Sequence, residues 1–131
     1  MRYLFDTNAV IALLNDPGGP LAQRARRCRP ADIGLPAIVV YELYFGAFKS
    51  QRRARNTAIA DALQFEVVPF DKEDARKAGE IRAFLEALGT PIGPYDVQIA
   101  GQACARCLVL VSRNLREFQR VDGLTVENWE G

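Results

Sequence analysis

The sequence predicts a single α/β domain in which a central parallel sheet lies between layers of helices. Short apolar segments alternate along the chain with longer amphipathic segments, an order typical of parallel strands that are joined by helices. The chain has 131 residues, of which 49% are hydrophobic and 25% are charged. A chain of this length and composition can bury a core, so we expect one soluble domain that spans residues 1–131.

The first half of the chain is expected to form three strands and four helices. The run RYLF, residues 2–5, is a short apolar strand that leads into a helix at TNAVIALLN. The turn DPGGP, residues 16–20, ends that helix because glycine and proline do not continue it. The next elements are, in order, a basic helix over 20–28, a strand over 32–36, helices over 37–48 and 52–63, and a strand over 65–70.

The helix expected over residues 71–89 has the clearest signals. Asp71 is a good N-cap, and Glu73 and Asp74 lie in the first turn, where the helix dipole favours negative charge. Gly89 stands where a glycine commonly ends a helix. The apolar stripe has helical spacing and consists of Ala75, Ala78, Ile81, Leu85 and Leu88. After the stiff turn TPIGP we expect a helix over 95–106, a strand over 107–112 and a final strand over 125–129.

The charged residues are unevenly distributed although the net charge is only +1. The segments RARRCR, residues 24–29, and KSQRRAR, residues 49–55, each hold four basic residues and no acidic one. They are either solvated helix faces or a rim that binds phosphate. No apolar run approaches the roughly 20 residues of a membrane helix, so no contact with a membrane is expected.

The cysteine and histidine content limits the chemistry. Three cysteines without a secretion signal favour a reducing, cytoplasmic setting. Cys104 and Cys107 form a CxxC motif, but zinc would need further ligands that the chain lacks, so we expect both to pack as small apolar residues. The chain has no histidine. Hydrolysis would therefore depend on carboxylates, a lysine, a hydroxyl group or a metal ion rather than a histidine triad.

Polar residues stand at four comparable places in the predicted fold. Asp6 ends the first strand, Asp96 opens a helix, and Asn114 follows the fourth strand. Glu42 lies in the apolar segment AIVVYELYFGAF, where an ionised carboxylate must face solvent or have a partner.

Each of these positions also has a structural explanation. Asp6 could cap the first helix, as could Thr7. Asp96 could be an N-cap or respond to the helix dipole, and Asn114 has capping-box spacing with Glu117. Carboxylates that converge on one pocket repel each other, however, and such clusters serve mainly to hold hard divalent cations. Mg²⁺ or Mn²⁺ with oxygen ligands suits phosphate chemistry.

The sequence resembles the PIN-domain ribonucleases and, among them, the VapC toxins of bacterial toxin–antitoxin pairs. The segments that carry the resemblance are LFDTN (4–8), YELYFGA (41–47), IGPYDVQIAGQA (92–103) and LVSRNLREFQRVDGLTVENW (110–129). It covers nearly the whole chain. The resemblance implies a three-layer α/β/α PIN-like fold and metal-dependent endonucleolytic cleavage of RNA.

The resemblance also implies roles for the polar residues. Asp6 and Asp96 would hold Mg²⁺, and Glu42 would complete the site as a ligand or as the base that orients the attacking water. Asn114 matches a position where many PIN domains carry a fourth acid. Its neutral side chain leaves open whether one or two ions bind, and it could instead hydrogen-bond a water or position Asp6. Thr7 and Asn8 would support the ligands. Attack by a metal-activated water would not need the ribose 2′-hydroxyl.

The resemblance implies partners as well. The substrate would be an RNA, such as a tRNA cut in a single-stranded loop, and a VapB antitoxin would cover the acidic pocket. A homodimer and a toxin–antitoxin hetero-oligomer are expected, with the apolar helix face over 38–48 as an interface or antitoxin groove. The side chains expected to bind substrate are Arg113, Arg116, Tyr95, Arg52 and Lys49.

Two alternatives remain open from the sequence. A non-catalytic PIN-like module could bind RNA or a protein, and the neutral Asn114 favours it. Another carboxylate–metal hydrolase, such as a DNA flap nuclease or a small phosphatase, is the second alternative. The chain is short for the extra helical elements of a structure-specific DNA nuclease.

Overall fold

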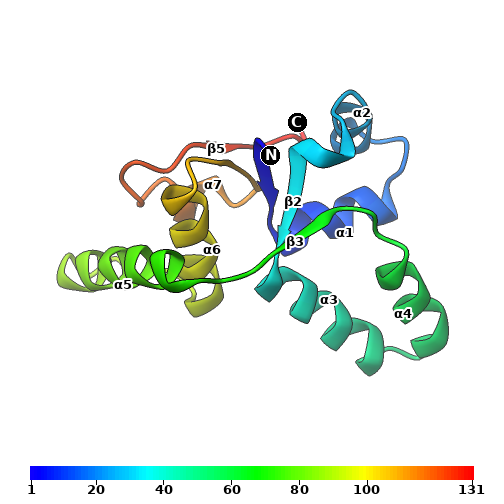
Figure 1. Cartoon of the computed structure of the whole chain (residues 1–131), viewed down its shortest axis with the longest axis horizontal. Coiled ribbons are helices and arrows are strands. Elements are labelled where there is room, and N and C mark those ends of the chain that lie inside the picture. Colours follow the sequence, from blue (N-terminus) through cyan, green and yellow to red (C-terminus); the bar gives the residue numbers. More distant parts are fainter.

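The computed structural model describes residues 1–131, and its centre is a five-stranded sheet in which all strands are parallel. The strand order is β3-β2-β1-β4-β5. The strands are β1 (Tyr3–Phe5), β2 (Ile33–Pro36), β3 (Glu66–Val68), β4 (Val109–Val111) and β5 (Val126–Glu127). This is the predicted fold class, an α/β domain with a central parallel sheet, and Figure 1 shows the helices around it.

Seven α-helices connect the strands, and helices alternate with strands as the sequence predicts. They are α1 (Thr7–Asn15), α2 (Pro20–Arg26), α3 (Ala37–Lys49), α4 (Arg53–Asp61), α5 (Lys72–Ala87), α6 (Pro94–Ala105) and α7 (Leu115–Phe118). A short 3₁₀ turn, η1 (Pro30–Asp32), precedes β2. No helix is long and apolar enough to cross a membrane.

Strand β1 lies at the centre of the sheet and sets the position of the site. It pairs with β2 on one side and with β4 on the other, and Leu4 and Phe5 are fully buried. The chain thus builds the sheet outward in one direction through β2 and β3, and then in the other through β4 and β5. In sheets of this type, ligands bind at the carboxyl ends of the strands where this direction reverses. That point lies between the ends of β1 and β4.

The helices form two groups that project to opposite sides of the strands in Figure 1, with α3 and α4 in one and α5 and α6 in the other. Helices α5 and α6 approach each other closely at Gly101. A Cβ atom at that position would lie 2.6 Å from both the Cα and the Cβ of Ala78. Glycine is therefore needed at Gly101 for the close packing of the helix that begins next to the site.

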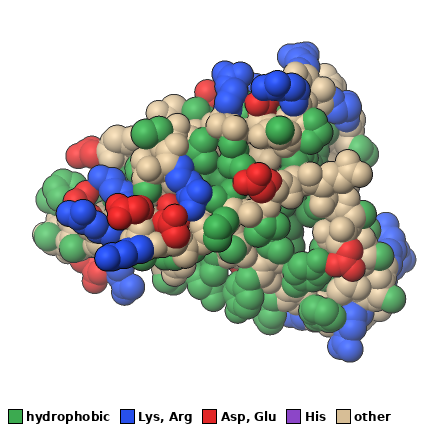
Figure 2. Space-filling model, in the orientation of Figure 1, with side chains coloured by type: hydrophobic (Ala, Val, Ile, Leu, Met, Phe, Trp, Pro, Cys, Tyr) green, Lys and Arg blue, Asp and Glu red, His purple; other side chains and the backbone are tan.

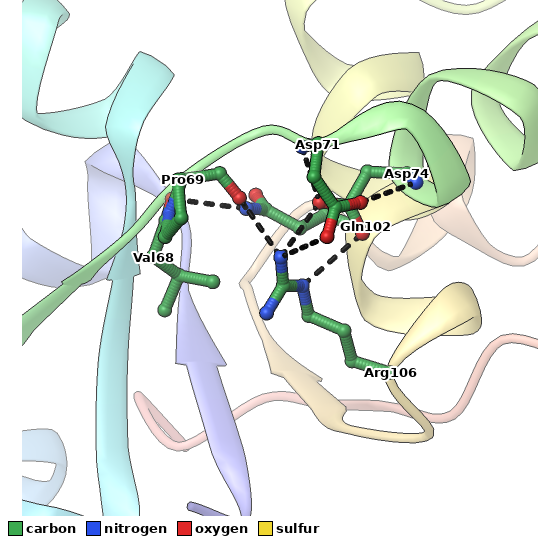
Figure 3. A network of polar contacts seen from close by, with 6 residues as sticks. All are labelled: Val68, Pro69, Asp71, Asp74, Gln102 and Arg106. Carbon is green, nitrogen blue, oxygen red and sulfur yellow. Dashed lines mark hydrogen bonds and ion pairs between the residues drawn. The ribbon is translucent and has the colours of Figure 1, made fainter.

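A polar network attaches this helix pair to the sheet, as Figure 3 shows. Arg106 donates hydrogen bonds to both carboxylate oxygens of the buried Asp74, at 3.1 and 2.9 Å. Burial disfavours the charged form of Asp74, but the hydrogen bond and charge of Arg106 outweigh this and hold its pKa below the usual value. The Gln102 amide donates to the carbonyls of Val68 and Pro69. The end of β3, the start of α5 and the end of α6 are thereby joined.

Most element boundaries agree with the predictions to within two or three residues. The N-cap predicted at Asp71 is confirmed. It is part of a capping box that was not predicted, since Asp71 and Asp74 each accept a hydrogen bond from the other's backbone N–H. Gly89 has a φ of 72°, as a glycine at a helix end requires. Strands β3, β4 and β5 are shorter than expected, and α7 was not predicted.

The cysteine prediction is only half right. Cys104 is partly buried and packs against the core. Cys107 is exposed and has a φ of 56°, so it does not pack as an apolar residue. It follows the end of α6 in a left-handed conformation that glycine usually adopts.

Candidate active site

Asp6 lies at the carboxyl end of the central strand and is 4% exposed. It is the N-cap of α1, because its Oδ1 accepts a hydrogen bond of 2.9 Å from the Ala9 backbone N–H. Burial raises the pKa of Asp6, while hydrogen bonds from the Ser112 side chain and from Ala9 oppose that rise. Asp6 therefore caps the helix itself, and the alternative that Thr7 is the cap is wrong.

Glu42 faces the site from the second turn of α3, where it is partly buried. The Thr7 hydroxyl donates a hydrogen bond of 2.8 Å to Glu42 Oε1. Glu42, an acid in an apolar helix, needs a polar partner, and that partner is Thr7, the residue after Asp6. This bond ties α1 to α3 and holds the second carboxylate near the first.

Asp96 lies in the first turn of α6 and joins the other two acids. Its pKa is raised to about 6, first by burial, then by a hydrogen bond and charge from Glu117, and also by the charges of Asp6 and Glu42. Such electrostatic effects require short distances. The structure therefore brings Asp6, Glu42 and Asp96 together, although they come from three elements that are far apart in the sequence.

Asn114 contacts Glu117, but not through the expected capping box. It occupies the N-cap position of α7, but its side chain makes no capping hydrogen bond. The Nδ2 atom instead donates to Glu117 Oε2 at 3.0 Å, and the backbone N–H donates to Ser112 Oγ at 2.9 Å. The capping-box explanation is wrong. The side chain of Asn114 hydrogen-bonds Glu117 and not Asp6.

Sequence reasoning missed Glu117 and Ser112 as site residues. Glu117 is the fourth acid beside Asp96, and it reaches the site from α7. From the sequence, the three-residue spacing between Asn114 and Glu117 suggested only a helix cap. The structure shows instead that α7 brings the two side chains into contact with each other. Ser112 is the buried residue that follows β4, the neighbour of β1. Ser112 could have been found from the sequence, because it ends a predicted strand just as Asp6 follows the first one.

Comparisons with known proteins agree with this arrangement. A family model described as "PIN domain" matches residues 3–124. A relative from Salmonella typhimurium (strain LT2) named tRNA(fMet)-specific endonuclease VapC is 37% identical over 98% of each chain. A relative of the same name from Shigella flexneri is 34% identical, also over 98% of each chain. This chain belongs to the PIN-domain family and, within it, to the VapC ribonucleases. The resemblance seen in the sequence is therefore confirmed.

A solved structure leads to the same conclusion for the PIN fold. The structure is the DNA-bound VapBC of Salmonella typhimurium, and it matches with a TM-score of 0.93 at 37% identity over 98% of both chains. The likeness thus extends across the whole VapC chain.

The donor atoms of this VapC site fit a hard divalent cation in their chemistry. They are carboxylate and hydroxyl oxygens, and the chain has no histidine. The pKa of Asp96 is raised by burial and, to a smaller extent, by the neighbouring acids. No group of three or more acidic or cysteine side chains is arranged to hold a metal ion. The carboxylates would therefore have to move closer to one another around an ion.

The residues expected to bind substrate do not form one group. Arg113 is near Asp6, whose pKa its charge lowers, and Tyr95 packs edge-on against Tyr41 with ring centroids 6.1 Å apart. Arg52 and Lys49 lie near the turn between α3 and α4, and Arg116 is exposed on α7. Figure 2 shows Lys and Arg side chains at the top and right edges of the molecule, where α2 and α4 lie in Figure 1. Of the residues expected to bind substrate, Arg113 and Tyr95 are therefore the two with a link to the acids, Arg113 through its charge on Asp6 and Tyr95 as the neighbour of Asp96 in the chain.

Proposed function

We propose that this protein is the ribonuclease toxin of a VapBC-type toxin–antitoxin pair and that it hydrolyses RNA at the acidic site. The observation that carries the proposal is the convergence of Asp6, Glu42, Asp96 and Glu117, in which three of the acids raise the pKa of the fourth. Repulsion of this kind destabilises the protein unless the site binds something positive. We propose a divalent cation, Mg²⁺ or Mn²⁺, held by Asp6 and Asp96.

The mechanism assigns each residue a task. A divalent cation held by Asp6 and Asp96 would supply activation of a water molecule and stabilisation of the leaving oxygen. Asp6 is held by the backbone of α1, since its Oδ1 accepts a hydrogen bond from the Ala9 N–H. Glu42 is oriented by the Thr7 hydroxyl and serves as the base that orients the water. Asn114 keeps Glu117 beside Asp96.

Cleavage assays with isosteric variants test the proposal. Asp6→Asn and Asp96→Asn keep the shape of the side chain and remove its charge, so each should reduce Mg²⁺-dependent RNA cleavage by about a hundredfold or more. Asp122→Asn is the matched control, because Asp122 is exposed and lies outside the site. Calorimetry with Mn²⁺ gives a second readout. Cleavage by the Asp6→Asn/Asp96→Asn double variant at the wild-type rate would exclude this site.

We propose a tRNA as the substrate. The Salmonella and Shigella relatives are named as endonucleases specific for tRNA(fMet). The aromatic ring of Tyr95 and the guanidinium of Arg113 are suited to bind the base and the phosphate of an unpaired nucleotide. Sequencing of RNA ends after induced expression, with Asp6→Asn as the control, would identify the target. Incubation with initiator and elongator tRNA(Met) in parallel would show whether the initiator form is preferred.

A groove beside the acids is the proposed site for a VapB antitoxin. It has a volume of about 320 Å³, and at one end it reaches Thr7 and Glu42. Its apolar lining comes from α1, α3, α4 and the residues just after α4, and includes Ile11, Leu14, Leu43, Ala47, Ile59 and Leu63. An apolar segment bound there would lie against the site, so a basic side chain next to it could pair with the carboxylates.

Two leucine variants separate neutralisation from catalysis. Leu14 is 39% exposed on the groove, and Leu88 is 61% exposed at the end of α5, outside the groove. Leu14→Lys should retain RNA cleavage and weaken inhibition by the antitoxin, because a charge would be placed in an apolar groove. Leu88→Lys should leave both unchanged. Equal inhibition of the two variants would place the antitoxin elsewhere.

A further inference from the structure

The C-terminal segment is packed against the strand that ends at Asp6. The buried Trp129 lies edge-on to two residues of β1, with ring centroids 4.8 Å from Tyr3 and 5.4 Å from Phe5. Its Nε1 donates a hydrogen bond of 2.8 Å to Glu127. The Arg24 guanidinium lies over its other side, 4.5 Å from the ring centroid. The residue after Trp129 is therefore held in a defined place next to the site.

That residue is Glu130, and only one of its two carboxylate oxygens has a partner. The side chain is 23% exposed, and its Oε2 atom is fully buried with no hydrogen-bond partner. Its Oε1 atom lies 3.8 Å from Nη1 of Arg113, the ion pair that the structure shows for Glu130. An unsatisfied buried oxygen destabilises a protein, so its presence needs an explanation.

Arg113 lies between two acids. It follows Ser112 at the end of β4, and its guanidinium contacts Glu130. Its charge lowers the pKa of Asp6, whereas the charge of Glu130 raises it. The side chain is 60% exposed, so it is free to turn. If Arg113 closed onto Asp6, it would neutralise the carboxylate that is proposed to hold the cation. If it stays with Glu130, its remaining N–H groups are free for a phosphate.

We propose that Glu130 is a positioning residue that holds Arg113 beside the acidic site, ready for a substrate phosphate, and prevents it from pairing with Asp6. The inference depends on the ribonuclease function proposed above. Arg113 and Glu130 line a hollow of about 290 Å³ together with Asn8 and Asn15 of α1. The guanidinium of Arg113 can therefore be reached from outside through this hollow, and a phosphate of the substrate would approach it from there.

A measurement without metal or RNA tests the contact itself. The Nε–H signal of Arg113 in ¹H–¹⁵N spectra, assigned with Arg113→Lys, reports the partner of the guanidinium. Glu130→Gln should shift this signal, and the further change Asp6→Asn should shift it again, because Arg113 then loses its second partner. Glu127→Gln, on the same segment, keeps the acceptor for Trp129 and should leave the signal unchanged. An Arg113 signal that does not respond to Glu130→Gln overturns the proposal, whatever the nuclease activity.

Metal binding then tests the consequence. Glu130→Gln should weaken Mn²⁺ binding about tenfold, because Arg113 is then released to pair with Asp6, one of the proposed metal ligands. Arg113→Ala should bind Mn²⁺ at least as tightly as the wild type, and Glu130→Gln/Arg113→Ala should match Arg113→Ala. A double variant that binds as weakly as Glu130→Gln would show a direct charge effect and overturn the proposal. If the wild type binds no Mn²⁺, the proposed function fails, and the spectra alone decide the role of Glu130.

Discussion

The same substitution at two glycines of the α5–α6 pair should have opposite effects on stability. Gly101 in α6 faces Ala78, and a Cβ there would lie 2.6 Å from the Ala78 Cα atom and 2.7 Å from its N atom. Carbon atoms in contact prefer about 3.5–4.0 Å, so the helices would have to move about 1 Å apart. Overpacking of this kind lowers the free energy of unfolding by about 1–3 kcal/mol, and the clash with main-chain atoms favours the upper part of that range.

Gly79 in α5 is the matched control, because nothing lies within 4 Å of a Cβ at that position. Alanine is a better helix former than glycine by about 1 kcal/mol in an exposed helix interior. Gly79→Ala should therefore raise the free energy of unfolding by about 0.5–1 kcal/mol. Gly101→Ala gains the same helix propensity but loses more through the clash, and we expect a net loss of about 1–2 kcal/mol.

Urea unfolding followed by circular dichroism measures both variants. The transition midpoint should fall for Gly101→Ala and rise for Gly79→Ala, with an unchanged slope. Because α6 carries Asp96 in its first turn, Gly101→Ala should also reduce RNA cleavage, and Gly79→Ala should not. Equal stabilisation by both substitutions would show that the two helices are not in the close contact described here.

Three further predictions follow from the site and the polar network. Thr7→Val removes the donor to Glu42 and should reduce cleavage about tenfold, whereas Thr7→Ser should retain activity. Because the pKa of Asp96 is raised from 3.8 to about 6, the metal-free native protein binds extra protons between these values. Its free energy of unfolding in urea should therefore fall as the pH rises from 4 to 6, by about 1–2 kcal/mol after allowance for partial exposure, and not in Asp96→Asn. Cleavage should instead be lost as the pH falls below about 6, since a protonated Asp96 cannot hold a cation. Arg106→Met leaves the buried Asp74 unpaired and should lower the urea midpoint by the equivalent of about 2 kcal/mol, less than for a fully buried pair because Arg106 is partly exposed.

Local signals explain why several elements could be predicted. The N-cap Asp71 and the C-terminal Gly89 mark the ends of α5 with interactions inside one segment of chain. Helix α7 is only four residues long, and so short a helix carries too little periodicity to be recognised. The exposed, left-handed Cys107 was mispredicted because its conformation is set by the chain that leaves α6 for β4.

The site residues, too, are of two kinds: some are marked by local sequence signals and others are brought in only by the fold. Asp6, Glu42 and Asp96 were recognisable because each is an acid at a place where an apolar element starts, ends or would otherwise exclude it. Glu117 was not recognisable, since its partnership with Asp96 arises only when α7 folds over the start of α6. The homodimer expected from the family resemblance stays a prediction.

By itself the sequence determined the α/β class, the family and three of the four converging acids, because these depend on residue order and local periodicity. The tertiary structure decided that β1 lies at the centre of the sheet and that Thr7 holds Glu42. It also decided that Glu117 lies beside Asp96 and that Glu130 lies beside Arg113. These contacts join residues far apart in the chain, and pairing of that kind is set by how the strands and helices pack rather than by any segment alone.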